Sequence, residues 1–189
     1  MVRKIAQTLY VLTIGGVTAA RAYLEDRTER KLVARFRLSD IKSLGDQAVL
    51  ANIVRHHWDH HVASAAASCL TNQRRLEFFA NDASLDHEVR VACIRQLADQ
   101  HVLVQIALRS RNVLLAQAAA ERVTESWGFH ELMRSPMITV RSIAAMNCRD
   151  PEILFDYFSD EDERVRDFAE TSLAEIGIDP RTRAAAGAA

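Results

Sequence analysis

The chain has 189 residues, with a formal net charge of −1 at pH 7, an aromatic content of 6%, six glycines and three prolines. Such a composition argues against a strand-rich fold with many tight turns, and the three commonest residues (alanine, arginine and leucine) favour helix. The balanced charge argues against a dedicated nucleic-acid binder, whose basic face would leave a net positive charge.

Residues 1–24 allow two interpretations. Two basic residues precede an uncharged run from Ile5 to Ala20, and Ala20-Arg21-Ala22 has the small residues of a cleavage site, which together outline an export signal or membrane anchor. The run is short for a membrane span and contains polar residues such as Gln7, which favours a buried or capping helix instead. We therefore expect a cytoplasmic protein, with export or membrane association through residues 1–24 as the alternative.

Residues 25–46 predict a charged helix, with Leu32 and Val33 turned inward, followed by a degenerate copy of the repeat described below. In that copy Ser39 and Asp40 stand where small apolar residues are expected. Terminal repeats are commonly atypical because their outer face meets water. Residues 1–46 are thus predicted to be an N-terminal helix and a degenerate capping repeat.

From residue 47 to about 176 the sequence repeats every 25 to 27 residues. Each copy has an apolar anchor, small or apolar residues three and four positions later, and another apolar residue at position eight. These positions share one face of a helix, so the pattern predicts an amphipathic helix, called here the second helix of its repeat. The anchors of repeats one to five are Val62, Val89, Leu115, Val140 and Val165.

A shorter apolar pattern precedes each anchor and predicts a first helix. It carries apolar residues three and six positions after its start. A single short helix pair cannot cover two apolar stripes, so the pairs must stack on one another. Gly177 is predicted to end the last helix, and residues 177–189 are predicted to be a flexible tail. The first helices are expected to start at Gln47, Gln73, Gln100, Ser126 and Pro151. Side chains that can cap the second helices are Asp59, Asp86, Asn112 and Asp162.

Three stretches resemble the short repeats of bacterial HEAT-like proteins. They are Leu70-Thr71-Asn72-Gln73 to Phe79, Leu97-Ala98-Asp99-Gln100 to Ala107, and the intervening Asp86-His87-Glu88-Val89-Arg90-Val91-Ala92. The resemblance covers about residues 41–176, and repeat three departs from it with Leu115-Ala116 in place of Val-Arg. It implies an all-α fold, a right-handed HEAT-like α-solenoid of about five to six helix pairs. Most relatives use this fold to bind other proteins.

Histidines form the one conspicuous polar cluster, and on a continuous helix their spacing of four would suit zinc. The repeat instead places a turn there, so we predict a solvated histidine-rich loop and no metal site. His87-Glu88 and His130-Glu131 fall at different repeat positions and do not match the paired motifs of di-iron HEAT-like oxygenases. The three cysteines are predicted to be structural. The clustered histidines are His56, His57, His60 and His61.

No catalytic motif and no cofactor site emerge from the sequence, so we expect the chain not to be an enzyme. Several solvent-side positions of the second helices are apolar, which predicts an interaction surface; tight packing between repeats is the alternative. We expect another protein, rather than nucleic acid or a small substrate, to dock there on a strip of Val91, Ile94, Arg95, Gln117, Glu121, Ser142 and Met146. The predicted function is a non-catalytic protein-binding or scaffolding module that uses the inner face of the HEAT-like solenoid. An accessory or lyase-type protein acting on a cofactor-bearing partner is the alternative.

Overall fold

The computed structural model describes residues 28–179, which are helical with connecting turns and contain no strand. The chain divides into two compact units, Met1–Leu70 and Thr71–Ala189. No helix in the described part of the chain has the length and hydrophobicity needed to cross a bilayer. The predictions for residues 1–24 and for the end of the tail lie outside the described residues. The all-α prediction is confirmed.

Within the first unit, α4 and α5 form a helix pair and α3 packs against α5. These helices span Leu38–Ile41 (α3), Gln47–His56 (α4) and His60–Ser68 (α5). Residues 28–33 are also helical. Val33 is buried as predicted, but Leu32 is 49% exposed, so its predicted inward orientation is wrong. Adjacent residues on a helix point about 100° apart, and only Val33 faces the rest of the unit.

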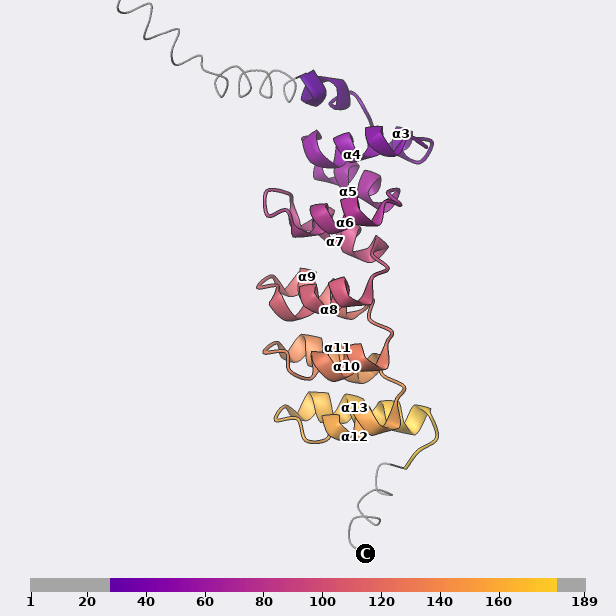
Figure 1. Ribbon diagram of the computed structural model, residues 1–189, viewed down its shortest axis with the longest axis vertical. Helices are drawn as coiled ribbons and strands as arrows, with labels where there is room; N and C mark the ends of the chain where they lie inside the picture. Colours follow the sequence, from indigo (N-terminus) through magenta and orange to yellow (C-terminus); the bar gives the residue numbers. More distant parts are fainter. Residues whose placement is uncertain (1–27, 180–189) are drawn as a thin grey trace, which may run out of the picture. The chain divides into compact units, whose positions relative to one another are not determined.

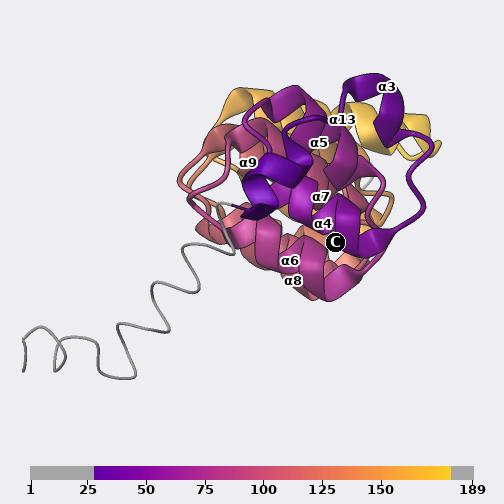
Figure 2. The same ribbon diagram turned by 90° about the horizontal axis from the view of Figure 1, so that it is seen from above.

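The second unit is a succession of helix pairs (Figure 1). Within it α7 packs against α9, α9 against α11 and α11 against α13, while α10 packs against both α8 and α12. Figure 2 shows α6 and α8 on one side of this unit and α9 and α13 on the other. The helices are α6 (Gln73–Asn81), α7 (His87–Gln96), α8 (Gln100–Arg109), α9 (Val113–Ala120), α10 (Ser126–Leu132), α11 (Ile138–Asn147), α12 (Pro151–Tyr157) and α13 (Glu163–Glu175).

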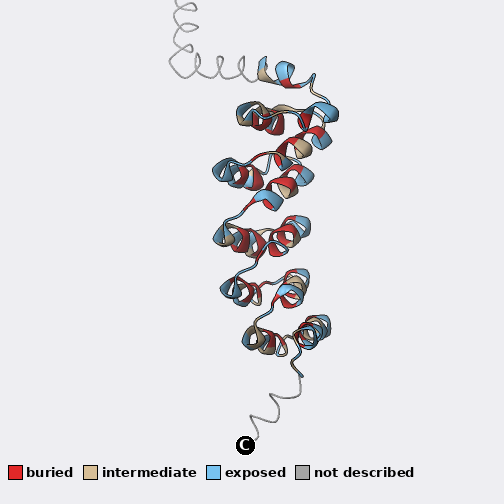
Figure 3. Cartoon of the chain, turned by 90° about the vertical axis from the view of Figure 1, so that its right-hand side faces the viewer, coloured by how far each residue is buried: buried red, intermediate tan, exposed pale blue. Residues whose placement is uncertain are grey.

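The repeated apolar positions form the cores of both units. All five anchors are buried, and so are the residues three and six positions into the first helices. Each first helix begins at the predicted residue. Buried residues accordingly lie where helices face one another (Figure 3). The buried first-helix residues are Leu50, Leu76, Leu103, Phe129 and Leu154, followed by Ile53, Phe79, Ile106, Leu132 and Tyr157.

The predicted caps of the second helices are confirmed. Each of these side chains accepts a hydrogen bond from a backbone N–H in the first turn of the helix that it precedes. Such a cap stabilises a helix by about 1 kcal/mol because it satisfies a donor that has no partner within the helix. The capping residues are Asp59, Asp86, Asn112 and Asp162.

Glutamine at the start of a first helix closes its helix pair, a role that the apolar pattern does not reveal. Its side-chain amide bonds to the backbone of the turn that follows the second helix. Repeats four and five have Ser126 and Pro151 at this position. The side-chain Nε2 donates to Cys69 O from Gln47 (3.1 Å), to Gln96 O from Gln73 (3.1 Å) and to Arg122 O from Gln100 (3.3 Å). The side-chain Oε1 of Gln73 accepts from Ala98 N–H (2.9 Å), and that of Gln100 accepts from Thr124 N–H (2.8 Å).

The arginine that follows an anchor ties down the turn between the two helices of its own repeat. Its guanidinium donates to a backbone carbonyl of that region, so the Val-Arg dipeptide has a structural explanation. The bonds join Arg90 Nε to Ala80 O (2.9 Å), Arg141 Nη1 to Ser135 O (2.8 Å) and Arg166 Nη1 to Asp160 O (2.7 Å).

The predicted helix stop at Gly177 is confirmed. Helix α13 ends at Glu175, and Gly177 has a φ of +79°, a conformation that glycine adopts without strain. The N–H of Ile178 then donates to Leu173 O at 3.0 Å, and that of Gly177 to Ala174 O at 3.0 Å. These bonds satisfy carbonyl groups that the end of the helix leaves without partners.

Candidate interaction surface

The second helices of repeats two to four expose most of the strip predicted from the sequence. Of its seven residues, Arg95, Glu121 and Met146 are exposed, and Val91, Gln117 and Ser142 are half-buried. Ile94 is fully buried, so its prediction as a surface residue is wrong.

Ile94 is buried because consecutive second helices lie against one another. It stands five residues after its anchor, as do Ala120 and Ala145 in the next two repeats, and all three side chains are fully buried. Because α7 packs against α9 and α9 against α11, this position falls in the contact between neighbouring helices. For these three residues the alternative explanation, packing between repeats, is therefore correct.

An exposed apolar pair, absent from the predicted strip, lies at the beginning of α9. Val113 is 49% exposed and Leu114 is 51% exposed. They stand two positions and one position before the anchor, where α13 has Glu163 and Arg164. Comparison with the charged residues at the start of the fifth repeat's second helix could have revealed the pair, because it falls on positions that contribute nothing to the core.

Val113 and Leu114 share a helix face with the strip residues of α9. Positions two and one before an anchor lie on the same side of a 3.6-residue helix as positions two and six after it. In α9 the latter two positions are Gln117 and Glu121, whose side chains form a hydrogen bond of 3.0 Å between Nε2 and Oε1. The outward face of α9 therefore has an apolar beginning and a polar end.

The histidine cluster does not lie on one helix, which confirms the predicted break. Helix α4 ends at His56 and α5 begins at His60. His57 Nδ1 accepts from the Asp59 N–H at 3.0 Å, and His57 Nε2 lies 3.2 Å from Phe36 O, so this imidazole ties the turn to residue 36. His56 Nε2 lies 3.1 Å from a Glu29 carboxylate oxygen. These two side chains are half-buried, and the prediction of a solvated loop is wrong for them.

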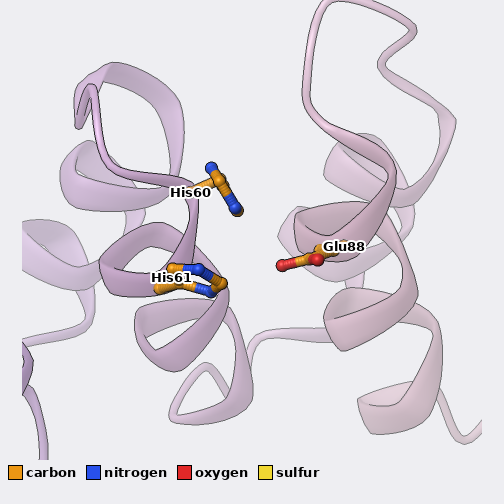
Figure 4. Close-up of side chains that lie close together, drawn as sticks. All are labelled: His60, His61 and Glu88. Carbon is orange, nitrogen blue, oxygen red and sulfur yellow. The ribbon is translucent and has the colours of Figure 1, made fainter.

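His60 and His61 are the exposed members of the cluster. Their ring centroids lie 4.2 Å apart at the start of α5. Figure 4 shows both imidazoles, and also Glu88, which is in the first turn of α7 in the second unit. Within the described residues of the first unit, no third histidine, cysteine or carboxylate joins this pair to form a group suited to a metal ion.

The cysteines are free thiols in the described structure. Cys93 and Cys148 are fully buried, and Cys69 is half-buried. Burial raises the pKa of the Cys93 thiol to about 12, because removal from water disfavours the thiolate. Burial likewise raises the pKa of Cys148. The two buried thiols are therefore poor nucleophiles, as expected for structural residues.

Every buried side-chain nitrogen and oxygen atom in the described residues has a hydrogen-bond partner.

Comparison of the sequence with protein-family models and with curated proteins finds no match. The resemblance to HEAT-like repeats thus rests on this chain's own residues.

Proposed function

We propose that the chain is a right-handed HEAT-like α-solenoid of about five to six helix pairs, acting as a non-catalytic protein-binding or scaffolding module. The succession of helix pairs in the second unit and the burial of the repeated positions support the fold. The binding surface would be the inner face of the solenoid, formed by the solvent-exposed side of the second helices and comprising Val91, Arg95, Val113, Leu114, Gln117, Glu121, Ser142 and Met146.

The exposed pair Val113–Leu114 is the observation that carries this proposal. About half of each side chain is exposed, and α13 has the charged residues Glu163 and Arg164 at these two positions, whereas α11 has Ile138 and Thr139. Met146 on α11 adds a third exposed apolar side chain to the same class of positions. A protein-binding surface commonly has apolar side chains at its centre and polar groups around them.

The contribution of these exposed side chains to partner binding follows from their exposure. Full burial of a leucine or methionine side chain contributes roughly 1.5–3 kcal/mol, and about half of Leu114 is already covered. Covering the remainder would therefore contribute on the order of 1 kcal/mol, or about a fivefold gain in affinity for each such residue.

The test is a pull-down from an extract of the native cell, read by mass spectrometry. We expect the same protein to be retained by the parent chain and by Phe78→Ser, but lost with the double variant Val113→Ser/Leu114→Ser. Phe78 is a matched control because it is also an exposed apolar residue, 53% exposed, on a first helix. Equal capture by both variants would place the partner elsewhere, and a copurifying chromophore would favour the accessory-protein alternative.

A cytoplasmic location is proposed on the weak hydrophobicity of residues 1–24. The native protein should then begin at residue 1 or 2 in the soluble fraction. N-terminal sequencing that starts near Tyr23, or recovery with membranes, would contradict this proposal.

A further inference from the structure

A positively charged pocket of about 440 Å³ lies between the pairs α6/α7 and α8/α9 of the second unit. Its ionisable lining residues are Arg90, Arg109, Arg111 and Glu77, so three positive charges face one negative charge. In the described part of the chain, no ion pair joins Glu77 to any of these arginines. The pocket therefore has an uncompensated positive charge.

Arg141 shows what an arginine at the position of Arg90 binds elsewhere in this chain. Both residues directly follow an anchor. Arg141 forms a two-point contact with Asp160, in the turn between the helices of the next repeat, through Nε–Oδ2 (2.7 Å) and Nη2–Oδ1 (3.1 Å). Its Nη2 also lies 3.3 Å from a Glu161 carboxylate oxygen.

Ser110 stands at the place of Asp160 in the turn near Arg90. Asp160 Oδ1 accepts a hydrogen bond from the N–H of the capping residue Asp162 at 2.9 Å. Ser110 Oγ accepts the matching bond from Asn112 N–H at 3.2 Å. A hydroxyl group thus replaces a carboxylate, and the following residue is Arg111 where the other turn has Glu161.

We propose that this pocket binds a carboxylate group from outside the chain, at the place that the Asp160 carboxylate occupies beside Arg141. The planar guanidinium suits a carboxylate through two parallel N–H···O bonds. Arg90 Nε is committed to Ala80 O, so its two terminal nitrogens and those of Arg109 and Arg111 are the donors available to the ligand. Asn112 and Ser110 supply further polar groups to the lining.

Another cavity of this unit does not share this character. It has a volume of about 720 Å³, and its ionisable lining residues are Glu121, Asp150 and Arg149. Arg149 is also paired with Glu175 at 2.9 Å. An excess of positive charge therefore distinguishes the pocket at Arg90 from this cavity.

The experiment is calorimetric titration of the full chain, at constant ionic strength, with succinate, with an acetylated and amidated Gly-Glu-Gly peptide, and with inorganic phosphate. We expect saturable binding of a carboxylate probe. Tighter binding of the peptide would assign the carboxylate to a protein ligand, and tighter binding of succinate would assign it to a free organic acid.

The deciding variant is Ser110→Asp, which gives Arg90 the internal carboxylate that Arg141 already has. It should weaken binding roughly ten- to hundredfold, as expected for loss of hydrogen bonds to a charged group. Arg90→Met should weaken binding similarly, whereas Arg74→Met, which removes an exposed arginine of α6 that does not line the pocket, should not.

Four results would overturn the proposal. They are an absence of saturable binding by both carboxylate probes, binding of phosphate alone, unchanged binding in a folded Ser110→Asp chain, and equal weakening by Arg74→Met. If Arg90→Met unfolds because Ala80 O loses its donor, Ser110→Asp still decides the question. None of the pocket variants lies at Val113 or Leu114, so this test can fail independently of the proposed partner surface.

Discussion

The buried ion pair between Arg141 and Asp160 gives the sharpest test of how consecutive repeats are held together. The side chains of Arg141 and Asp160 are 7% and 9% exposed. Arg141 is on α11, and Asp160 lies in the turn between α12 and α13. Arg141 also donates to Ser135 O at 2.8 Å, so the guanidinium joins two turns.

Asp160→Ala should lower the free energy of unfolding by about 3 kcal/mol. Removing one partner of a buried ion pair typically costs about 3–5 kcal/mol, because the other charge stays buried without compensation. The low end applies since Glu161 remains 3.3 Å from Arg141 Nη2, although its side chain is 88% exposed and largely solvated. For a chain of this size, the melting temperature should fall by roughly 6–12 °C.

The assay is urea unfolding followed by circular dichroism, with two further variants. The double variant Arg141→Met/Asp160→Ala should recover most of the loss, because a buried apolar pair needs no charge compensation. Arg134→Ala removes an exposed ion pair with Glu131 (2.9 Å) and should change stability by less than about 1 kcal/mol. A loss below about 1 kcal/mol for Asp160→Ala, or no recovery in the double variant, would refute this account.

Three other predictions concern single residues. Cys93 should resist alkylation at pH 8 in the folded chain and react in urea, as mass spectrometry would show, because burial raises its pKa to about 12; rapid reaction without urea would contradict its burial. Gly128→Ala should destabilise by roughly 1–3 kcal/mol in urea unfolding, since the added Cβ would lie 2.7 Å from Val123 Cγ1; an unchanged midpoint would mean that this contact relaxes freely. The hydrogen bond from Arg164 lowers the pKa of Asp162, so Asp162→Asn should lose stability at pH 7, and unfolding at several pH values should show this difference shrinking below about pH 4. A difference that grows in acid would reverse this assignment.

Much of the helical framework was predictable because the same few contacts recur. A residue such as Leu103 or Val140 is buried in its repeat for the same reason as its counterparts, so five weak signals support one another. The starts of the first helices were also predictable, because a capping side chain precedes most of them.

The surface was less predictable, because the apolar stripe of a helix shows which side faces its own pair but not what lies beside it. Ile94 and Met146 stand five and six residues after their anchors, about 100° apart on the helix. Only the packing of α7 against α9 shows that the first position is covered. Alanine at positions such as Ala120 adds to the ambiguity, since its small side chain is common both inside and outside.

The start of α9 differs from the start of α13 at several positions that do not contribute to the core. The fold explains the anchor, the cap, the glutamine and the arginine, so a residue that breaks the pattern without improving the packing calls for another explanation. In this short stretch Ser110 and Arg111 stand where the fifth repeat has Asp160 and Glu161, and Val113 and Leu114 stand where it has Glu163 and Arg164. The pocket lined by Arg111 and Asn112 is therefore followed directly along the chain by the exposed apolar pair. A protein ligand with an acidic residue next to an apolar one would satisfy both features, and that pattern is the one to seek among captured partners.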